Sequence, residues 1–322
     1  MTSTQDHAAV VIGTRGSELA LWQARHLQAL LGGEAAGVTL QIIRTRGDKL
    51  LDIPLQQQVD KGFFTKELES ALLDRSVDVA VHSLKDLPTQ MPPGVVLAAV
   101  PTRADVGDVL FVHPQAYAAG FALPMRAGAK VGTASLRRKA LLDHAAPHAV
   151  STFLRGNVPT RLNKAKTGEL DAVILARAGV ARLGLALDGL LAFDLDPTLW
   201  LPAAAQGALG IQCRDDDRAL CERLQAIADP QATRAVAIER ELLQRMEGGC
   251  HSPFGATAVV AGDQATLRAG TVDATQRWHA VVCAGPWAAL AGQAEAELRE
   301  KLASAPSPPE ARPWVTPSRP WS

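Results

Sequence analysis

The chain has 322 residues, 47% hydrophobic and 20% charged, which is enough for about two or three domains with their own cores. Lysine plus arginine and aspartate plus glutamate both number 33, and this zero net charge argues against binding nucleic acid through bulk charge. We expect no membrane span and no signal peptide, because no apolar run is long enough, and therefore a cytoplasmic protein. The spacing of the four cysteines predicts neither a disulfide framework nor a metal site.

Strands and helices alternate in the first hundred residues. Hydrophobic residues 10–12 predict a buried strand, a glycine-rich turn follows at 13–16, and Ser17 is a candidate helix N-cap. An apolar stripe between Ala20 and Leu31 predicts the helix that it would cap. The other expected elements are strands 38–43, 78–81 and 95–100 and a helix at 66–73. Such alternation is typical of an α/β layer with a mostly parallel sheet.

A second strand–helix series begins near residue 109. Strand 130–133 leads into a helix at 136–144, whose first turn carries Arg137 and Arg138. Positive charge is unfavourable at a helix N-terminus, so these two arginines are predicted to serve another purpose, such as binding a ligand. The other elements are strand 109–112, helix 158–168 and strand 171–175. A strand at 206–212 is predicted to return to the first lobe.

A smaller α+β domain is predicted after residue 231. Its elements are helix 232–246, strands 256–260, 265–272 and 279–283, and helix 287–303. The last residues are rich in proline and serine, a composition that predicts disorder. The expected divisions are a first lobe of 1–104 plus about 206–226, a second lobe of 105–205, a C-terminal domain of 227–303 and a disordered tail of 304–322.

Six arginines stand out because most of them lie beside Gly, Ser or Thr where a strand is expected to run into a helix. Backbone N–H groups and the helix dipole favour anions there, and arginine binds carboxylate or phosphate bidentately. Repetition of this pattern predicts a ligand with several negative groups, although any single position could be a surface arginine near a helix cap. No phosphate-binding P-loop motif is present. The six are Arg15, Arg137, Arg138, Arg155, Arg161 and Arg182.

A cluster of polar residues follows the strand at 78–81. Ser83, Lys85 and Asp86 lie at its carboxyl end, where open α/β sheets place ligands. Asp86 could act as a general acid or base or stabilise a cation, and Lys85 could hold an anion. The alternative is a polar loop closed by Pro88.

Cys250 follows a pair of glycines at the end of the helix at 232–246. An exposed cysteine on such a loop can be a nucleophile or a covalent anchor. The alternative is a small buried hydrophobic residue. His251 could activate the thiol, but no third member of a protease triad is evident.

Two aromatic residues, Phe63 and Phe64, follow Lys61 in a loop before the helix at 66–73. Aromatic residues make up only 4% of the chain, so an adjacent pair at a loop–helix boundary could line a site. A contact within the hydrophobic core is an equally good interpretation.

Taken together, these motifs resemble the porphobilinogen deaminase (hydroxymethylbilane synthase) family, and they occur in the family's order over residues 13–255. The matching runs are 13–17 with 20–24, 45–48, 61–64, 81–88, 132–138, 154–162, 174–176, 201–203, 206–207 and 247–250. The resemblance implies two α/β lobes like those of periplasmic binding proteins, with mostly parallel sheets, and a small α+β C-terminal domain. It also implies a dipyrromethane cofactor attached covalently through Cys250.

The activity implied is the head-to-tail condensation of four porphobilinogen molecules with loss of ammonia, releasing hydroxymethylbilane for tetrapyrrole biosynthesis. The resemblance assigns catalysis to Asp86 and Lys85. Residues implied to hold the cofactor are Cys250, Ser83, Lys85, Asp86, Thr133, Ser135, Arg137, Arg138, Arg155 and Gly156. Residues implied to bind substrate are Arg15, Ser17, Lys61, Phe64, Arg155, Arg161, Arg182 and Gln206.

The expected partner is porphobilinogen, and we expect a monomer that needs no metal, nucleic acid or membrane. The alternative is a non-catalytic two-lobed protein that binds a polycarboxylate ligand. That alternative explains the arginines and the α/β lobes, but it does not explain Cys250 on its glycine loop.

Overall fold

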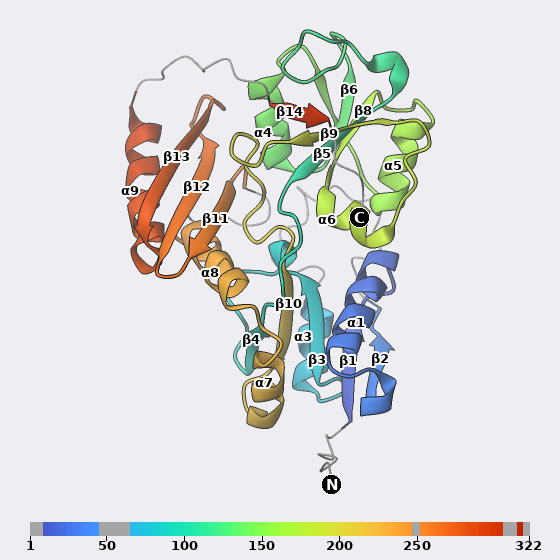
Figure 1. The fold of residues 1–322 in the computed structure, drawn as a ribbon, viewed down its shortest axis with the longest axis vertical. Coiled ribbons are helices and arrows are strands. Elements are labelled where there is room, and N and C mark those ends of the chain that lie inside the picture. Colours follow the sequence, from blue (N-terminus) through green and yellow to red (C-terminus); the bar gives the residue numbers. More distant parts are fainter. Residues whose placement is uncertain (1–8, 45–64, 247–251, 305–313, 318–322) are drawn as a thin grey trace. The chain divides into compact units, whose positions relative to one another are not determined.

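A computed structural model of the chain describes residues 9–44, 65–246, 252–304 and 314–317 (Figure 1). These residues divide into two compact units, one made of the part up to Arg103 with Ala208–Thr233, the other of Ala104–Gly207 with the part from Arg234 onward. Three sheets of five, six and three strands organise the described residues. None of the helices in these ranges has both the length and the apolar character needed to cross a membrane.

The first lobe is built on a five-stranded sheet. Its strands are β1 (Val10–Thr14), β2 (Val38–Ile42), β3 (Val79–Ser83), β4 (Val95–Ala99) and β10 (Leu209–Arg214), and its helices are α1 (Glu18–Leu30), α3 (Lys66–Leu73) and α7 (Arg218–Gln225). The order is β2-β1-β3-β10-β4, and β10 runs antiparallel to both of its neighbours. The other four strands share one direction, which confirms the mostly parallel sheet and the return of strand 206–212 to this lobe.

Helix α1 begins where the sequence predicted. The Ser17 hydroxyl accepts a hydrogen bond from the backbone N–H of Ala20 at 3.3 Å, which satisfies one of the free donors of the first turn. Ala24 and Leu27 of this helix are fully buried against Ile12 of β1 in the lobe's core. The predicted N-cap and the apolar stripe are therefore confirmed.

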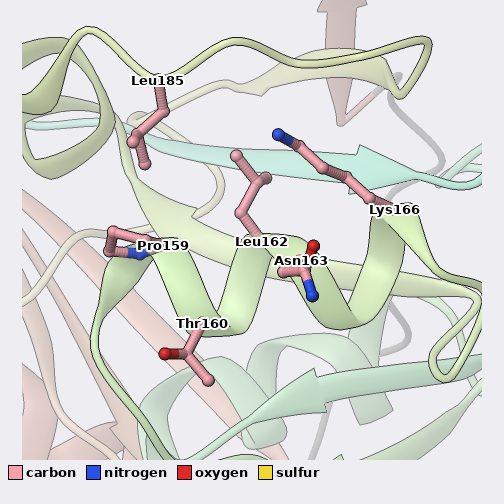
Figure 2. A pocket seen from close by; sticks show the side chains of 6 residues that line it. All are labelled: Pro159, Thr160, Leu162, Asn163, Lys166 and Leu185. Atoms are coloured by element: carbon pink, nitrogen blue, oxygen red, sulfur yellow. The ribbon is translucent and has the colours of Figure 1, made fainter.

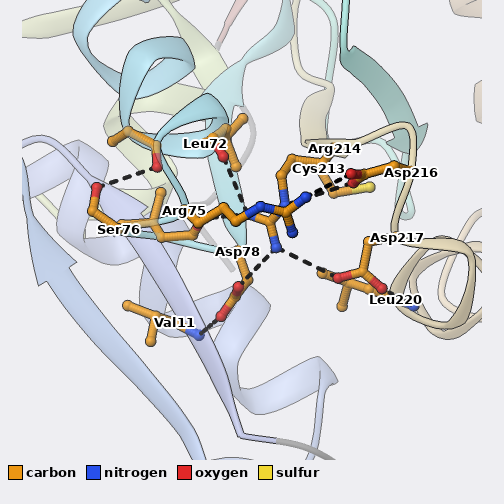
Figure 3. Close-up of polar contacts among 12 residues, drawn as sticks. Val11, Leu72, Arg75, Ser76, Asp78, Cys213, Arg214, Asp216, Asp217 and Leu220 are labelled. Carbon is orange, nitrogen blue, oxygen red and sulfur yellow. Dashed lines mark hydrogen bonds and ion pairs between the residues drawn. The ribbon is translucent and has the colours of Figure 1, made fainter.

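Arg214, the last residue of β10, fastens the amino-terminal ends of β1 and β3 (Figure 3). Its Nη1 donates to the carbonyl oxygens of Leu72 and Val77 at 3.1 and 2.8 Å, and its Nη2 donates to Asp78 at 3.0 Å. Asp78 in turn accepts from the N–H of Val11 at 2.9 Å. One buried guanidinium thus joins α3, β1, β3 and β10 at the edge of the sheet away from Asp86.

The second lobe contains a six-stranded sheet. Its strands are β5 (Asp108–Val112), β6 (Lys130–Thr133), β7 (Val150–Phe153), β8 (Ala172–Ala176), β9 (Leu191–Leu195) and β14 (Val315–Pro317), and its helices are α4 (Leu136–Ala145), α5 (Val158–Lys166) and α6 (Arg177–Leu183). The order is β14-β9-β5-β8-β6-β7, in which β5 and β14 run opposite to the other four. The five residues of β5 are all buried, with alternate residues in two separate core clusters, so both faces of the sheet are covered.

The C-terminal tail departs from the prediction of disorder. Residues 314–317 are ordered against the second lobe, where β14 pairs antiparallel with β9 and the Asp196 N–H donates to the Trp314 carbonyl at 3.2 Å. The prediction for this segment was wrong because proline and serine dominated its composition, whereas Trp314 and Val315 pack on an apolar core. The remaining predicted tail residues, 305–313 and 318–322, lie outside the described ranges.

The C-terminal α+β domain has the elements that the sequence predicted. It comprises helix α8 (Pro230–Arg245), strands β11 (Gly255–Ala261), β12 (Gln264–Val272) and β13 (Trp278–Pro286), and helix α9 (Leu290–Ala303). The three strands form an antiparallel meander. The Glu239 carboxylate of α8, fully buried, accepts from the N–H groups of Ala258 and Ala205 at 2.8 and 2.7 Å, which ties this domain to the segment that precedes Gln206.

Candidate active site

In the first lobe the predicted polar residues gather where β3 ends. Ser83 closes the strand, and a short 3₁₀ turn over Leu84–Asp86 follows it. Leu84 and Leu87 are buried, whereas Asp86 between them is exposed, so the buried leucines anchor the turn and present the carboxylate outward. The Leu84 N–H donates to the Ala208 carbonyl at 3.0 Å, because antiparallel β10 begins beside the end of β3.

Gln23 is a contributor that the sequence analysis did not select. Its side chain is buried, and its Nε2 donates to the Ser83 hydroxyl at 2.7 Å. This contact holds the Ser83 side chain to α1 across 60 positions of sequence. A glutamine in the apolar stripe of a helix was the available signal, since a buried polar side chain needs a partner.

Arg15 and His82 lie close enough for their charges to interact. His82 is buried, and its pKa falls to about 4, chiefly because burial disfavours its charged form and in part because Arg15 is positive. The imidazole is therefore neutral at neutral pH. Arg15, on the turn after β1, supplies the positive charge at this end of the first lobe.

In the second lobe, the carboxyl ends of β6, β7 and β8 meet at one edge of the sheet. Antiparallel β5 starts at the same edge, and Asp108 pairs with Ala176, the last residue of β8. Thr133 ends β6, and its hydroxyl accepts from the Ser135 N–H at 3.1 Å. Ser135 then caps α4 by accepting from the Arg138 N–H at 3.4 Å. The predicted hydroxyls thus lie at a helix N-terminus, where anions are favoured.

Arg137 and Arg138 both point toward Asp108. Arg137 Nη2 donates to Asp108 Oδ2 at 2.9 Å, and Arg138 binds both carboxylate oxygens through Nε at 3.1 Å and Nη2 at 2.7 Å. All three side chains are buried. Their placement in the first turn of α4, from which the sequence analysis inferred a ligand, is thus accounted for within the chain by Asp108. A further role of the two arginines in holding a ligand stays a prediction.

Two more donors contact the Asp108 carboxylate. Trp200 Nε1 donates to Oδ2 at 3.1 Å, and Gln206 Nε2 donates to Oδ1 at 2.8 Å. Gln206 also donates to the Val106 carbonyl at 2.7 Å, so its amide holds the segment that leads into β5. Asp108 and Trp200 were absent from the predicted site, because an isolated aspartate and an isolated tryptophan give no motif.

The charges of Arg137, Arg138 and Asp108 do not sum to zero. Two guanidinium groups share one carboxylate, and burial is the main cause that lowers the pKa of Arg137, with Asp108 opposing the shift and Arg138 adding to it. Arg137 Nε is buried and has no hydrogen-bond acceptor among the described residues. An anionic ligand would supply both the missing charge and an acceptor.

Arg155, Gly156 and Arg161 form a second group at the same edge of this sheet, after β7. Gly156 has φ +111°, and a Cβ there would lie 2.8 Å from Thr160, so this turn requires glycine. The Gly156 carbonyl accepts from Arg161 Nε at 2.7 Å. The Arg155 guanidinium lies 5.7 Å from the centre of the Phe153 ring, a cation–π contact.

Arg182 completes the predicted arginines of the second lobe. Its Nη2 donates to the Gly207 carbonyl at 2.7 Å, and burial lowers its pKa to about 10, which leaves it charged at neutral pH. Five residues that the sequence analysis considered lie outside the described ranges: Lys61, Phe63, Phe64, Cys250 and His251. In the residues that the structure does describe, no three His, Cys, Asp or Glu side chains come together as a metal site requires.

An open groove of about 440 Å³ lies on the second lobe, along α5 (Figure 2). It is lined by Pro159, Thr160, Leu162, Asn163, Lys166 and Leu185. None of these is a predicted site residue. Lys166, which Figure 2 shows at one end of the groove, is paired with Asp188 at 2.6 Å, so its charge is already compensated.

The fold and these groups define an α/β protein that presents arginine, hydroxyl and amide donors at strand ends, as proteins that bind polyanions do. The family described as "Porphobilinogen deaminase, dipyromethane cofactor binding domain" matches residues 10–222. The one described as "Porphobilinogen deaminase, C-terminal domain" matches residues 233–292. The chain therefore belongs to the porphobilinogen deaminase family, which confirms the predicted family and its dipyrromethane cofactor.

Individual relatives agree. A porphobilinogen deaminase from Nitratidesulfovibrio vulgaris is 48% identical over 258 residues, 79% of this chain and 80% of the relative. Those from Trichlorobacter lovleyi and Geobacter sulfurreducens are each 44% identical, covering 80% and 82% of this chain and the same shares of the relatives. An ABC transporter / periplasmic binding protein from Brucella ovis with glutathione bound gives a TM-score of 0.39 at 13% identity, over 74% of this chain and 69% of that chain. The strand order, not this last likeness, carries the assignment of the fold.

Proposed function

We propose that the chain condenses four porphobilinogen molecules head to tail, with loss of ammonia, and releases hydroxymethylbilane for tetrapyrrole biosynthesis. The observation that carries this proposal is the exposed Asp86 on a turn that two buried leucines anchor at the carboxyl end of β3, in a chain of this family. A carboxylate fixed in that way can stabilise a developing positive charge without having to reorganise.

The residues present fit a dipyrromethane, whose acetate and propionate groups are anions. Hydroxyl donors stand at the N-terminus of α4, and buried Arg137 retains a donor without an acceptor among the described residues. When bound, the cofactor supplies a covalently held pyrrole primer to which substrate units are added. The proposed cofactor-binding residues are Cys250, through a thioether, with Ser83, Lys85, Asp86, Thr133, Ser135, Arg137, Arg138, Arg155 and Gly156.

The chain's own groups divide the work. Asp86 accepts hydrogen bonds from pyrrole N–H groups and stabilises the cation left when the substrate loses ammonia, with Lys85 assisting beside it. Each addition forms one carbon–carbon bond and releases one ammonia, and water ends the reaction. Arginines bind the substrate carboxylates bidentately and so fix the orientation of the ring. The proposed substrate-binding residues are Arg15, Ser17, Lys61, Phe64, Arg155, Arg161, Arg182 and Gln206.

The intact mass of the purified chain, measured beside porphobilinogen consumption, tests this function. The parent should exceed its sequence mass by one dipyrromethane, and Cys250→Ser should lose both the added mass and turnover. Cys283→Ser is the matched control, because this buried cysteine lies in the C-terminal sheet and should keep both. An active parent of unmodified mass would refute the anchor. Porphobilinogen bound without being consumed would favour the non-catalytic polycarboxylate-binding protein instead.

The proposal extends to the setting of the enzyme. We infer a monomer of three domains with the boundaries expected from the sequence, except that residues 314–317 belong to the second lobe. We also infer that it acts in the cytoplasm on a small-molecule substrate without nucleic acid or membrane. The zero net charge of the chain supports the exclusion of nucleic acid. Light scattering on eluted protein gives the oligomeric state, and cell fractionation gives the compartment.

A further inference from the structure

The C-terminal segment 314–317 lies beyond residue 292, where the match to the family's C-terminal domain ends. It nevertheless pairs antiparallel with β9 at the edge of the second-lobe sheet, with Val315 opposite Leu195 and Pro317 opposite Phe193. Trp314 and Val315 pack against the core cluster of that lobe. The segment is therefore an integral edge of the second lobe.

Trp314 contacts two aromatic side chains in that core. Its ring meets Trp200 edge to face at 6.4 Å between ring centroids and 90° between planes. It meets His144 in the same manner at 5.7 Å and 78°. Both partners belong to the surroundings of α4: His144 lies in the last turn of that helix, and Trp200 contacts Asp108 beside its first turn. Edge-to-face pairs of this kind hold rings in a preferred orientation.

Trp200 connects this packing to the buried charges. It is fully buried, and its indole N–H donates to Asp108 Oδ2, the same oxygen that accepts from Arg137 and from Arg138 Nε. An indole that tilts away would leave that oxygen with fewer donors and let both guanidinium groups move. Trp314 packs against this indole, so a continuous line of contacts runs from the tail to the two arginines.

We propose that Trp314 is a positioning residue that acts through Trp200 and Asp108 to fix Arg137 and Arg138 for the ligand carboxylates. This inference rests on the proposed function, which assigns those arginines to the dipyrromethane. The tail then influences the reaction without itself contacting the substrate.

The test compares Trp314→Ala and Trp314→Leu with Trp314→Phe in the full-length chain. Trp287→Ala is the matched control, because Trp287 is also half-buried but packs on the core of the C-terminal domain. Tryptophan labelled with ¹⁵N gives one indole signal for each of the six tryptophans, and Trp200→Phe identifies the Trp200 signal. The fraction of chain carrying the dipyrromethane mass and the kcat and KM of the loaded fraction are measured beside it.

We expect Trp314→Ala and Trp314→Leu to shift the Trp200 signal, lower the loaded fraction and raise KM roughly 2- to 10-fold, the range of an aromatic pair. Trp314→Phe should restore all three, since phenylalanine keeps a ring edge. Trp287→Ala should leave them unchanged even if it lowers the melting temperature. Leucine at position 314 keeps apolar volume, so a folded variant is available should alanine unfold the lobe.

Two results would overturn the inference while leaving the proposed function intact. The first is a Trp200 signal that does not move in the Trp314 variants. The second is a signal that moves while the loaded fraction and KM stay at parent values, which would make the contact only structural. A parent chain that never consumes porphobilinogen would defeat the proposed function and this inference together, and the parent assay alone identifies that case.

Discussion

Trp200 donates its indole N–H to the Asp108 carboxylate at 3.1 Å across 92 positions of sequence. Around this pair the first turn of α4 and the Gln206 segment meet the start of β5, because both donate hydrogen bonds to the Asp108 carboxylate there. Asp108 is fully buried and accepts hydrogen bonds from four side chains, which makes it the structural centre of the second lobe. Its partners include the two arginines proposed to hold the cofactor.

Asp108→Asn should therefore be among the most destabilising single substitutions in the lobe. The amide is neutral and carries a donor of its own, so two buried guanidinium groups lose their counter-charge. Removal of one partner from a buried ion pair costs about 3–5 kcal/mol in the free energy of unfolding. Urea unfolding, monitored by circular dichroism, measures this loss in the free energy of unfolding.

Asp143→Asn provides the comparison for Asp108→Asn. Asp143 pairs with Lys139 on the exposed side of the same helix, and such surface pairs contribute less than about 1 kcal/mol. Equal losses in the two variants would show that the Asp108 cluster contributes no more than a surface pair.

Local features of this chain were predictable and distant ones were not. Ser17 was recognised as a cap because an N-cap, its turn and the apolar stripe that follows all lie within a few residues. Asp108 was missed because its donors are 29, 30, 92 and 98 positions away, and only the antiparallel course of β5 brings them to it. Strand β14 was missed because it gains order only by pairing with β9.

Asp86→Asn should abolish most turnover while leaving the fold intact. The side chain is exposed, so its replacement by an isosteric amide should change the free energy of unfolding by less than about 0.5 kcal/mol. Loss of a preorganised charge that faces a developing cation typically lowers kcat by about 10²–10³-fold. Steady-state porphobilinogen consumption, with intact mass to confirm cofactor loading, measures the effect.

Glu34→Gln is the control for charge alone, because Glu34 is an exposed acid elsewhere in the first lobe. It should retain the parent kcat. A loaded Asp86→Asn variant that turns over at the parent rate would exclude Asp86 as the catalytic carboxylate.

His82 should make the first lobe less stable in acid. The folded chain holds this imidazole with a pKa of about 4, against 6.5 for an ordinary histidine, so the unfolded chain binds the proton more tightly. Stability is then lost as the pH falls from 6.5 toward 4, with a limiting slope of about 1.4 kcal/mol per pH unit. Above pH 6.5 this group contributes no pH dependence.

Unfolding by urea at several pH values between 4 and 7.5 measures that slope, and His82→Gln should reduce it. His26→Gln is the matched control, because His26 is an exposed histidine on α1 of the same lobe. The same slope in His82→Gln as in the parent would mean that the acid sensitivity arises elsewhere.

Gly207 should tolerate no side chain, because two separate constraints meet at it. Its φ is +86°, and a Cβ would lie 2.5 Å from the Ala104 carbonyl oxygen, which is fixed backbone. Gly262→Ala isolates the first constraint, since Gly262 has φ +62° with nothing within 4 Å of the added carbon. We expect a loss of about 1 kcal/mol for Gly262→Ala and clearly more for Gly207→Ala, because strain in the backbone adds to the clash. Urea unfolding of the two variants measures the loss in the free energy of unfolding for each. Equal losses would mean that the backbone around Ala104 moves aside readily.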